Sequence, residues 1–199
     1  TIEYYGKTTD IGVRVIEAVP DVTDGKFVAE VISETECYIR EVYESAIING
    51  TLTIPETIQG YTVTGMETWL LNEFTGLRVI NLPLSFNSFS TYTFYGCDDL
   101  ERVNVAEGHK KYTSYNGIVY NKAETEIVFC PLSFRGELYI PAGVTSFDGT
   151  VLQALGNAIS VVIHDDNKEF KYEELWEEAK EIFVNVAKSL RTVDVPAKK

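Results

Sequence analysis

The sequence predicts an α+β fold in which short parallel strands stack as one ladder, with a β cap before them and an amphipathic helix after them. Three observations support this prediction. Five short segments repeat one alternation of apolar and polar residues, glycine-centred return motifs lie between them, and the two chain ends follow different patterns. Because a single coil cannot bury its apolar face alone, stacking of the coils would create the core.

The repeated segments have the period of a strand that buries one face. They cover residues 51–55, 79–83, 102–106, 137–141 and 160–164. Their second apolar positions are Ile54, Leu82, Val105, Ile140 and Ile163, at spacings of 28, 23, 35 and 23 residues. The repeated spacing of 23 predicts one repeat length, and the longer spacings predict hairpin insertions near residues 60–65 and 112–122. The predicted repeat region is residues 50–164, with about five coils.

A return motif recurs between the predicted strands. In each copy an apolar residue precedes a glycine and a Leu or Ile follows; the glycines are Gly76, Gly96 and Gly156. A glycine there can adopt a left-handed backbone and reverse the chain, while the flanking apolar side chains turn inward. A proline follows the strand in three of the five copies, where it would end the hydrogen bonding and turn the chain.

The two chain ends are predicted to cap the stack, because an open end would expose core residues. Residues 1–49 contain strand-like segments and an Asp24-Gly25 turn, which favour an N-terminal β cap. Residues 165–199 are predicted to form a helical cap and a tail. From Tyr172 to about Leu190, apolar residues recur every three or four positions, which is typical of an amphipathic helix.

The repeats resemble the BspA-like subclass of leucine-rich repeats. The closest matches to its strand and return motifs are residues 77–83 (LRVINLP), 94–100 (FYGCDDL) and 100–105 (LERVNV). The resemblance covers roughly residues 50–164 and implies a right-handed leucine-rich-repeat solenoid with a parallel β-ladder. Two features depart from the family pattern: Trp69 and two leucines in the first return segment, and the missing Gly-Cys pair in the last two coils.

Composition and motifs argue against several functional classes. A formal net charge of −13, with 17 basic and 30 acidic residues, disfavours nucleic acid as a partner. No apolar run approaches the roughly 20 residues that a membrane-spanning helix needs, so we expect no membrane insertion of this segment. The sequence contains no HExxH, GxSxG or glycine-rich phosphate motif. We therefore expect no catalytic residues, no cofactor and no metal site, and we expect His109 and His164 to be solvated.

The three cysteines, Cys37, Cys97 and Cys130, follow no CxxC or CxxH spacing. They are predicted to be free buried thiols that behave as small apolar residues. One disulfide with a leftover thiol remains the alternative.

The predicted outward face of the ladder supplies the candidate ligand-binding residues. With the apolar positions turned inward, Asn81, Arg102, Asn104 and Tyr139 would lie in rows on this face, and Tyr112 and Tyr115 would come from the insertion. Arg and Tyr are enriched at interface hot spots, and loops on a rigid scaffold often carry recognition. The alternative is that the face is merely solvated.

The resemblance implies a non-enzymatic bacterial protein, secreted or at the cell surface, that binds a host or matrix protein or a glycan, as adhesins do. We expect its signal or anchor to have been removed from this chain. An alternative is a structural module of a larger surface assembly with no ligand of its own, and an oligomer is possible. A third hypothesis is a hydrolase whose site is assembled only by folding.

Overall fold

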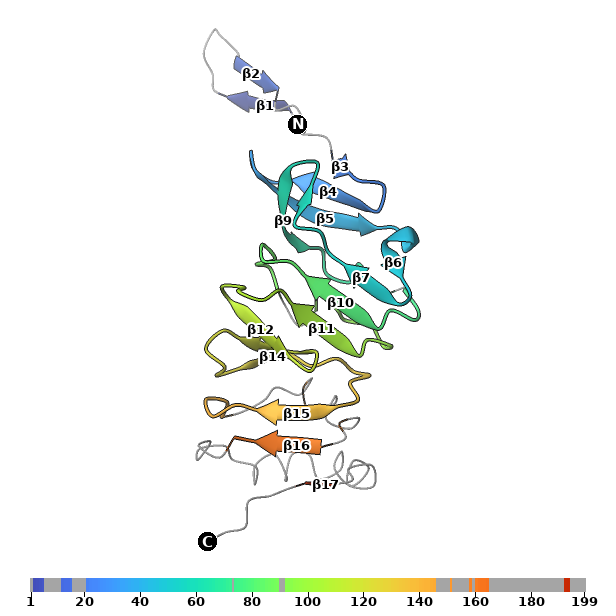
Figure 1. Ribbon diagram of the computed structural model, residues 1–199. Helices are drawn as coiled ribbons and strands as arrows, with labels where there is room; N and C mark the ends of the chain where they lie inside the picture. Colours follow the sequence, from blue (N-terminus) through green and yellow to red (C-terminus); the bar gives the residue numbers. More distant parts are fainter. Residues whose placement is uncertain are drawn as a thin grey trace.

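The computed structural model describes residues 2–5, 12–15, 21–72, 74–89, 92–145, 151, 158, 160–164 and 192–193. Its named elements are the strands β1 to β17 and one short 3-10 helix, η1 (Glu44–Ala46). Figure 1 shows the strands following one another down an elongated molecule. No helix in these ranges is long and apolar enough to cross a lipid bilayer.

The N-terminal part contains a hairpin and a five-stranded sheet. Strands β1 (Ile2–Tyr5) and β2 (Gly12–Val15) pair antiparallel. The sheet has the order β3 (Val22–Thr23), β4 (Phe27–Val31), β5 (Glu36–Val42), β9 (Tyr61–Met66) and β8 (Thr57–Ile58). The β5–β9 pair is parallel and the other pairs are antiparallel. The hairpin predicted near residues 60–65 therefore joins the N-terminal sheet.

The second sheet contains the first three repeated segments in matched register. Its order is β11 (Arg102–Val105), β10 (Val79–Leu82), β7 (Thr51–Thr53) and β6 (Ile47–Ile48). Strands β7, β10 and β11 are parallel, whereas β6 joins β7 antiparallel. The register places Leu52, Ile80 and Val103 side by side, and all three are fully buried. The spacings of 28 and 23 residues thus correspond to single steps across this sheet.

A three-stranded antiparallel sheet follows, formed by β12 (Tyr112–Tyr115), β13 (Ile118–Asn121) and β14 (Ile127–Phe129). We call it the meander. Three successive residues of β13 are buried: Ile118, Val119 and Tyr120. Val119 belongs to the large hydrophobic core on the N-terminal side, whereas Ile118 and Tyr120 belong to a second core on the C-terminal side. Strand β13 therefore separates two cores.

The last described sheet is parallel and consists of β15 (Glu137–Ile140), β16 (Ser160–Ile163) and β17 (Thr192–Val193). Glu137 pairs with Ser160, and Tyr139 pairs with Val162. All five repeated segments of the sequence thus include a strand.

The tight turn between β12 and β13 contacts β11, the edge strand of the second sheet. Gly117, with a φ of +90°, follows Asn116 between β12 and β13. Its carbonyl accepts a hydrogen bond from the Val103 amide of β11 at 2.9 Å. A Cβ at position 117 would lie 2.7 Å from the Arg102 Cβ, so only glycine fits. The Asn116 side chain donates to the Glu137 carbonyl at 3.3 Å, so the turn lies between β11 and β15.

The prediction of one regular right-handed solenoid with a continuous parallel ladder is wrong. Parallel pairing of the repeated segments is divided between two sheets, and the antiparallel meander lies between their strands β11 and β15. The physical reason is that residues 106–136 carry enough β-forming apolar residues to build a sheet of their own. The α+β class is also corrected, because the described residues are nearly all in sheets and the turns between them. The helix predicted from Tyr172 to about Leu190 lies outside the described residues.

Candidate functional site

A row of hydrogen-bonded side chains runs across the exposed face of the second sheet. The Asn81 Nδ2 donates to the Thr53 Oγ1 at 3.0 Å, and the Asn104 Nδ2 donates to the Asn81 Oδ1 at 2.9 Å. The three residues are neighbours because the parallel register aligns β7, β10 and β11. We call this the Asn row. Its mutual hydrogen bonds restrict the side-chain rotamers, which lowers the entropy cost of binding a partner.

Arg102 lies on β11, the edge strand of this sheet that faces the meander. Its side chain is exposed, and its Cα and Cβ lie against Gly117 of the meander turn. Asn104 and Arg102 are two residues apart on β11, so their side chains share a face of the strand. The structure therefore places Asn81, Asn104 and Arg102 on neighbouring strands of one sheet.

Two tyrosines form an aromatic patch on the next part of the molecule. The ring centroids of Tyr115 and Tyr139 lie 5.6 Å apart in an edge-to-face arrangement, and the His164 ring lies 6.3 Å from Tyr139. The buried Tyr120 hydroxyl donates to the Tyr139 carbonyl at 2.6 Å, which fixes β15 against the meander. Burial raises the Tyr120 pKa far above its ordinary value, so this hydroxyl stays protonated and can donate.

Tyr112 lies apart from the other candidate tyrosines. Its ring is half-buried and packs against Phe89 at 5.6 Å and His109 at 5.2 Å. Burial, followed by the nearby Glu126 carboxylate, raises the Tyr112 pKa. Its surroundings indicate core packing, so the structure does not place Tyr112 with Tyr115 and Tyr139.

The prediction that His109 is solvated is wrong, because its side chain is only 1% exposed. The His109 Nδ1 accepts hydrogen bonds from the amides of Lys111 and Tyr112, both at 3.1 Å. The Nε2 must then carry the hydrogen, and it donates to the Phe86 carbonyl at 2.9 Å. The His109 ring therefore holds the loop after β11 against the core. Its bond to Phe86 joins segments far apart in the chain, which the polar sequence around His109 did not indicate.

The three cysteines are free and buried, which confirms the prediction of structural thiols. Burial, with a smaller contribution from Asp98, raises the Cys97 pKa to about 12, and burial raises the Cys130 pKa to about 12. A thiol that is not ionised at neutral pH is a poor nucleophile and a poor metal ligand. Cys97 also donates to the Leu71 carbonyl at 3.6 Å, so it helps to stack one return segment on the previous one.

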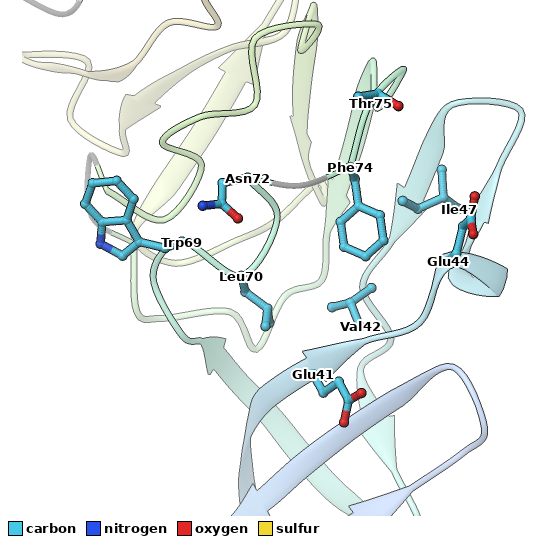
Figure 2. A pocket seen from close by; sticks show the side chains of 9 residues that line it. All are labelled: Glu41, Val42, Glu44, Ile47, Trp69, Leu70, Asn72, Phe74 and Thr75. Carbon is cyan, nitrogen blue, oxygen red and sulfur yellow. The ribbon is translucent and has the colours of Figure 1, made fainter.

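An open groove of about 590 Å³ lies between the N-terminal sheet and the first return segment, and no sequence pattern predicts it. Figure 2 shows the side chains that line it. Those on one side are Glu41, Val42, Glu44 and Ile47, from β5, η1 and β6, and those on the other side are Trp69, Leu70, Asn72, Phe74 and Thr75. We call it the Trp69 groove.

Trp69 also belongs to an exposed group of three aromatic rings. Its ring centroid lies 4.4 Å from that of Tyr95 and 6.3 Å from that of Tyr92. The residues are 47%, 55% and 57% exposed, respectively. Trp69 has a φ of +68°, which is a rare and strained backbone conformation for a large side chain. The sequence offered one signal, namely that Trp69 departs from the repeat motif.

Comparisons with known proteins find no matching family model and no matching curated protein. Among solved structures, the chain is similar to a leucine-rich repeat protein from Eubacterium ventriosum, with a TM-score of 0.41 and 22% identity over 58% of this chain and 31% of that one. A leucine rich cell surface protein from Faecalibacterium prausnitzii gives a TM-score of 0.45 and 17% identity over 75% and 44% of the two chains. A leucine-rich repeat protein from Bacteroides capillosus gives 0.41 and 16%, over 73% and 99%.

The chain resembles bacterial leucine-rich-repeat proteins. It spans less than half the length of two of these three leucine-rich-repeat structures. With identities below 25% and TM-scores below 0.5, their functions do not carry over, so the proposals below are argued from this chain's own residues.

Proposed function

We propose that this chain is a non-enzymatic bacterial surface protein that binds a protein or glycan ligand on the exposed sheet face. The observation that carries the proposal is the Asn row of Thr53, Asn81 and Asn104. After its bonds within the row, the Asn81 amide keeps a further N–H and a further acceptor lone pair. The row thus offers donors and acceptors in an ordered line, which suits peptide groups or sugar hydroxyls.

The aromatic patch extends this surface with a different chemistry. Tyr115 is exposed, and its ring packs edge-to-face against the Tyr139 ring. A tyrosine offers a large apolar ring with a polar tip, and few of its torsions need to be ordered on binding. A ligand that contacts both the Asn row and this patch would meet first polar and then apolar groups.

His109 and the three cysteines, which are residue types that often perform catalysis, serve the fold. The His109 ring is used in three internal hydrogen bonds, and the cysteine thiols have raised pKa values. This distribution supports a binding role. Secretion, surface location and adhesion are part of the proposal and rest on the resemblance of roughly residues 50–164 to BspA-like repeats.

A binding screen tests the proposal. The wild-type chain would be applied to a glycan array and to a panel of purified extracellular-matrix proteins. A triple variant, Asn81→Ala, Asn104→Ala and Tyr139→Ala, should weaken any specific binding at least tenfold, while its circular dichroism stays unchanged. The matched control is Glu34→Gln, an exposed residue in a loop of the N-terminal sheet.

Two outcomes would contradict the proposal. One is background binding throughout the screen, and the other is equal binding by the wild type and the triple variant. Sedimentation of the same samples tests the structural-module alternative. A stable oligomer that the triple variant dissociates would favour an assembly role for the sheet face.

A further inference from the structure

The Trp69 groove has the chemistry of a site for long cationic side chains. We propose that it binds a lysine- or arginine-rich segment of a partner protein, an inference that rests on the proposed binding function and names one class of partner. The groove and the Asn row share no residues, so the two surfaces can be tested separately.

Charge is the first argument for this ligand. Two of the nine lining residues, Glu41 and Glu44, are carboxylates, and none is Lys or Arg. Arg40, the cation next to Glu41 in sequence, pairs instead with Glu30 at 3.5 Å and Glu67 at 3.1 Å. The chain as a whole carries a formal charge of −13. The field at the groove therefore attracts cations and repels anionic ligands such as nucleic acids or acidic glycans.

The shape and polarity of the groove supply the second argument. Val42, Leu70 and Phe74 present apolar side chains to it, and Ile47 lies on the same side as Glu44 (Figure 2). Lys and Arg bury their methylene stems along apolar surface while the charged head seeks a polar partner. An apolar lining beside two carboxylates matches both parts of such a side chain. A purely apolar peptide would leave both carboxylates desolvated, which is unfavourable.

Trp69 supplies the third argument. A Trp ring is the strongest aromatic partner for a cation, which it attracts within about 6 Å of the ring centroid. The Tyr95 ring at 4.4 Å supports the indole, which remains 47% exposed. Strained backbone conformations such as the φ of +68° at Trp69 cluster at ligand sites. This conformation holds a large ring at the edge of an acidic groove.

Fluorescence polarisation with two synthetic peptides tests the inference. One labelled dodecapeptide alternates Lys and Ala, and the other has Gln in place of every Lys. The Lys peptide should bind wild-type protein at least tenfold more tightly than the Gln peptide. The double variant Glu41→Gln and Glu44→Gln should weaken binding of the Lys peptide at least tenfold. Trp69→Gly should weaken it about fivefold, since glycine accepts the backbone conformation while the ring is lost.

The charge-matched control is Glu34→Gln with Glu107→Gln, which removes the same charge from exposed positions outside the groove. This control should bind the Lys peptide within twofold of the wild type. Equal weakening by both double variants would mean diffuse attraction to an acidic protein and would overturn the inference. Equal binding of the Lys and Gln peptides, or no binding of either, would also overturn it.

The sheet-face triple variant separates this inference from the proposed function. If it loses a ligand from the glycan or matrix-protein screen while no Lys peptide binds the wild type, the proposed function stands and the groove inference fails. If the Lys peptide binds through the groove while the screen gives only background, the groove inference stands and the sheet-face proposal fails.

Discussion

The parallel strand β10 and the antiparallel strand β13 use their side chains in different ways. Strand β10 buries Ile80 and Leu82 and leaves Val79 and Asn81 partly exposed. Strand β13 buries Ile118, Val119 and Tyr120 in succession, on two cores. A strand with one open face can present a surface, whereas a strand buried on both faces joins two cores. The open face of β10 therefore suits the second sheet to the proposed binding role, and burial on both faces suits β13 to a connecting role.

Replacing buried residues of β13 and β10 should have the largest effects. Ile118→Ala and Val119→Ala should each lower the free energy of unfolding by about 2–4 kcal/mol, because each leaves a cavity in a different core. On β10 the neighbours should differ, with about 2–5 kcal/mol for Ile80→Ala and less than about 1 kcal/mol for the partly exposed Val79→Ala. Urea unfolding of the four variants measures this. A small effect of either β13 variant would contradict burial on both faces.

The Gly117 turn, which connects the meander to β11 of the second sheet, should be the next most sensitive feature. Gly117→Ala should cost about 2–3 kcal/mol, because alanine is strained at a φ of +90° and its Cβ would meet Arg102. Gly25→Ala is the control, since its φ of +83° carries a similar strain and nothing lies within 4 Å of the added Cβ. Gly25→Ala should cost about 1 kcal/mol in the same urea unfolding experiment. Equal losses would show that the turn does not press against β11.

The hydrogen bond between the meander and the last sheet should have an intermediate effect. Tyr120→Phe should cost about 1–2 kcal/mol, because it leaves the Tyr139 carbonyl without its buried donor. The exposed Tyr95→Phe is the control and should change stability by less than about 0.5 kcal/mol. Thermal unfolding compares the two. A neutral Tyr120→Phe variant would mean that β15 is held by packing alone.

The smallest effect should be the pH-dependent stabilisation by Glu56, whose carboxylate accepts hydrogen bonds from the turn after β10. Burial tends to raise the Glu56 pKa, but the nearby Ser85 side chain and hydrogen bonds from the backbone amides of Leu84 and Ser85 outweigh it and lower the pKa from about 4.5. The stabilisation is therefore complete above the ordinary pKa and is lost as pH falls through the lowered one. Glu56→Gln should be less stable than wild type by about 0.5 kcal/mol at pH 7, with the difference vanishing near pH 3. A difference that grows in acid would contradict this assignment.

The strands of the repeats were predictable because their signal is local. The alternation of Val79 to Leu82 and of Arg102 to Val105 marks one buried face, and in a parallel sheet the repeat spacing is the register. The position of Asn81 beside Asn104 followed from that spacing alone. The mutual hydrogen bonds of the Asn row required the coordinates.

The meander and the groove depend on non-local contacts, which local patterns do not specify. The apolar run from Ile118 to Tyr120 falls within the predicted hairpin insertion, although a run without alternation is typical of a strand buried on both faces. His109 was expected in solvent because its neighbours in sequence are polar, but Phe86 binds it from 23 residues away. The Trp69 groove joins residues 41–47 to residues 69–75, so no single stretch of sequence could show it.

The central claim is that the Asn row is a preformed part of the ligand surface. The most direct test is a nitrogen-15 NMR titration that follows the side-chain amides of Asn81 and Asn104, using the glycan or matrix-protein fragment that gives the strongest signal in the binding screen. We predict that these two resonances are among the most shifted and that the shifts extend to Tyr139. Saturated binding that leaves both side-chain amides unchanged, with shifts elsewhere, would contradict the claim.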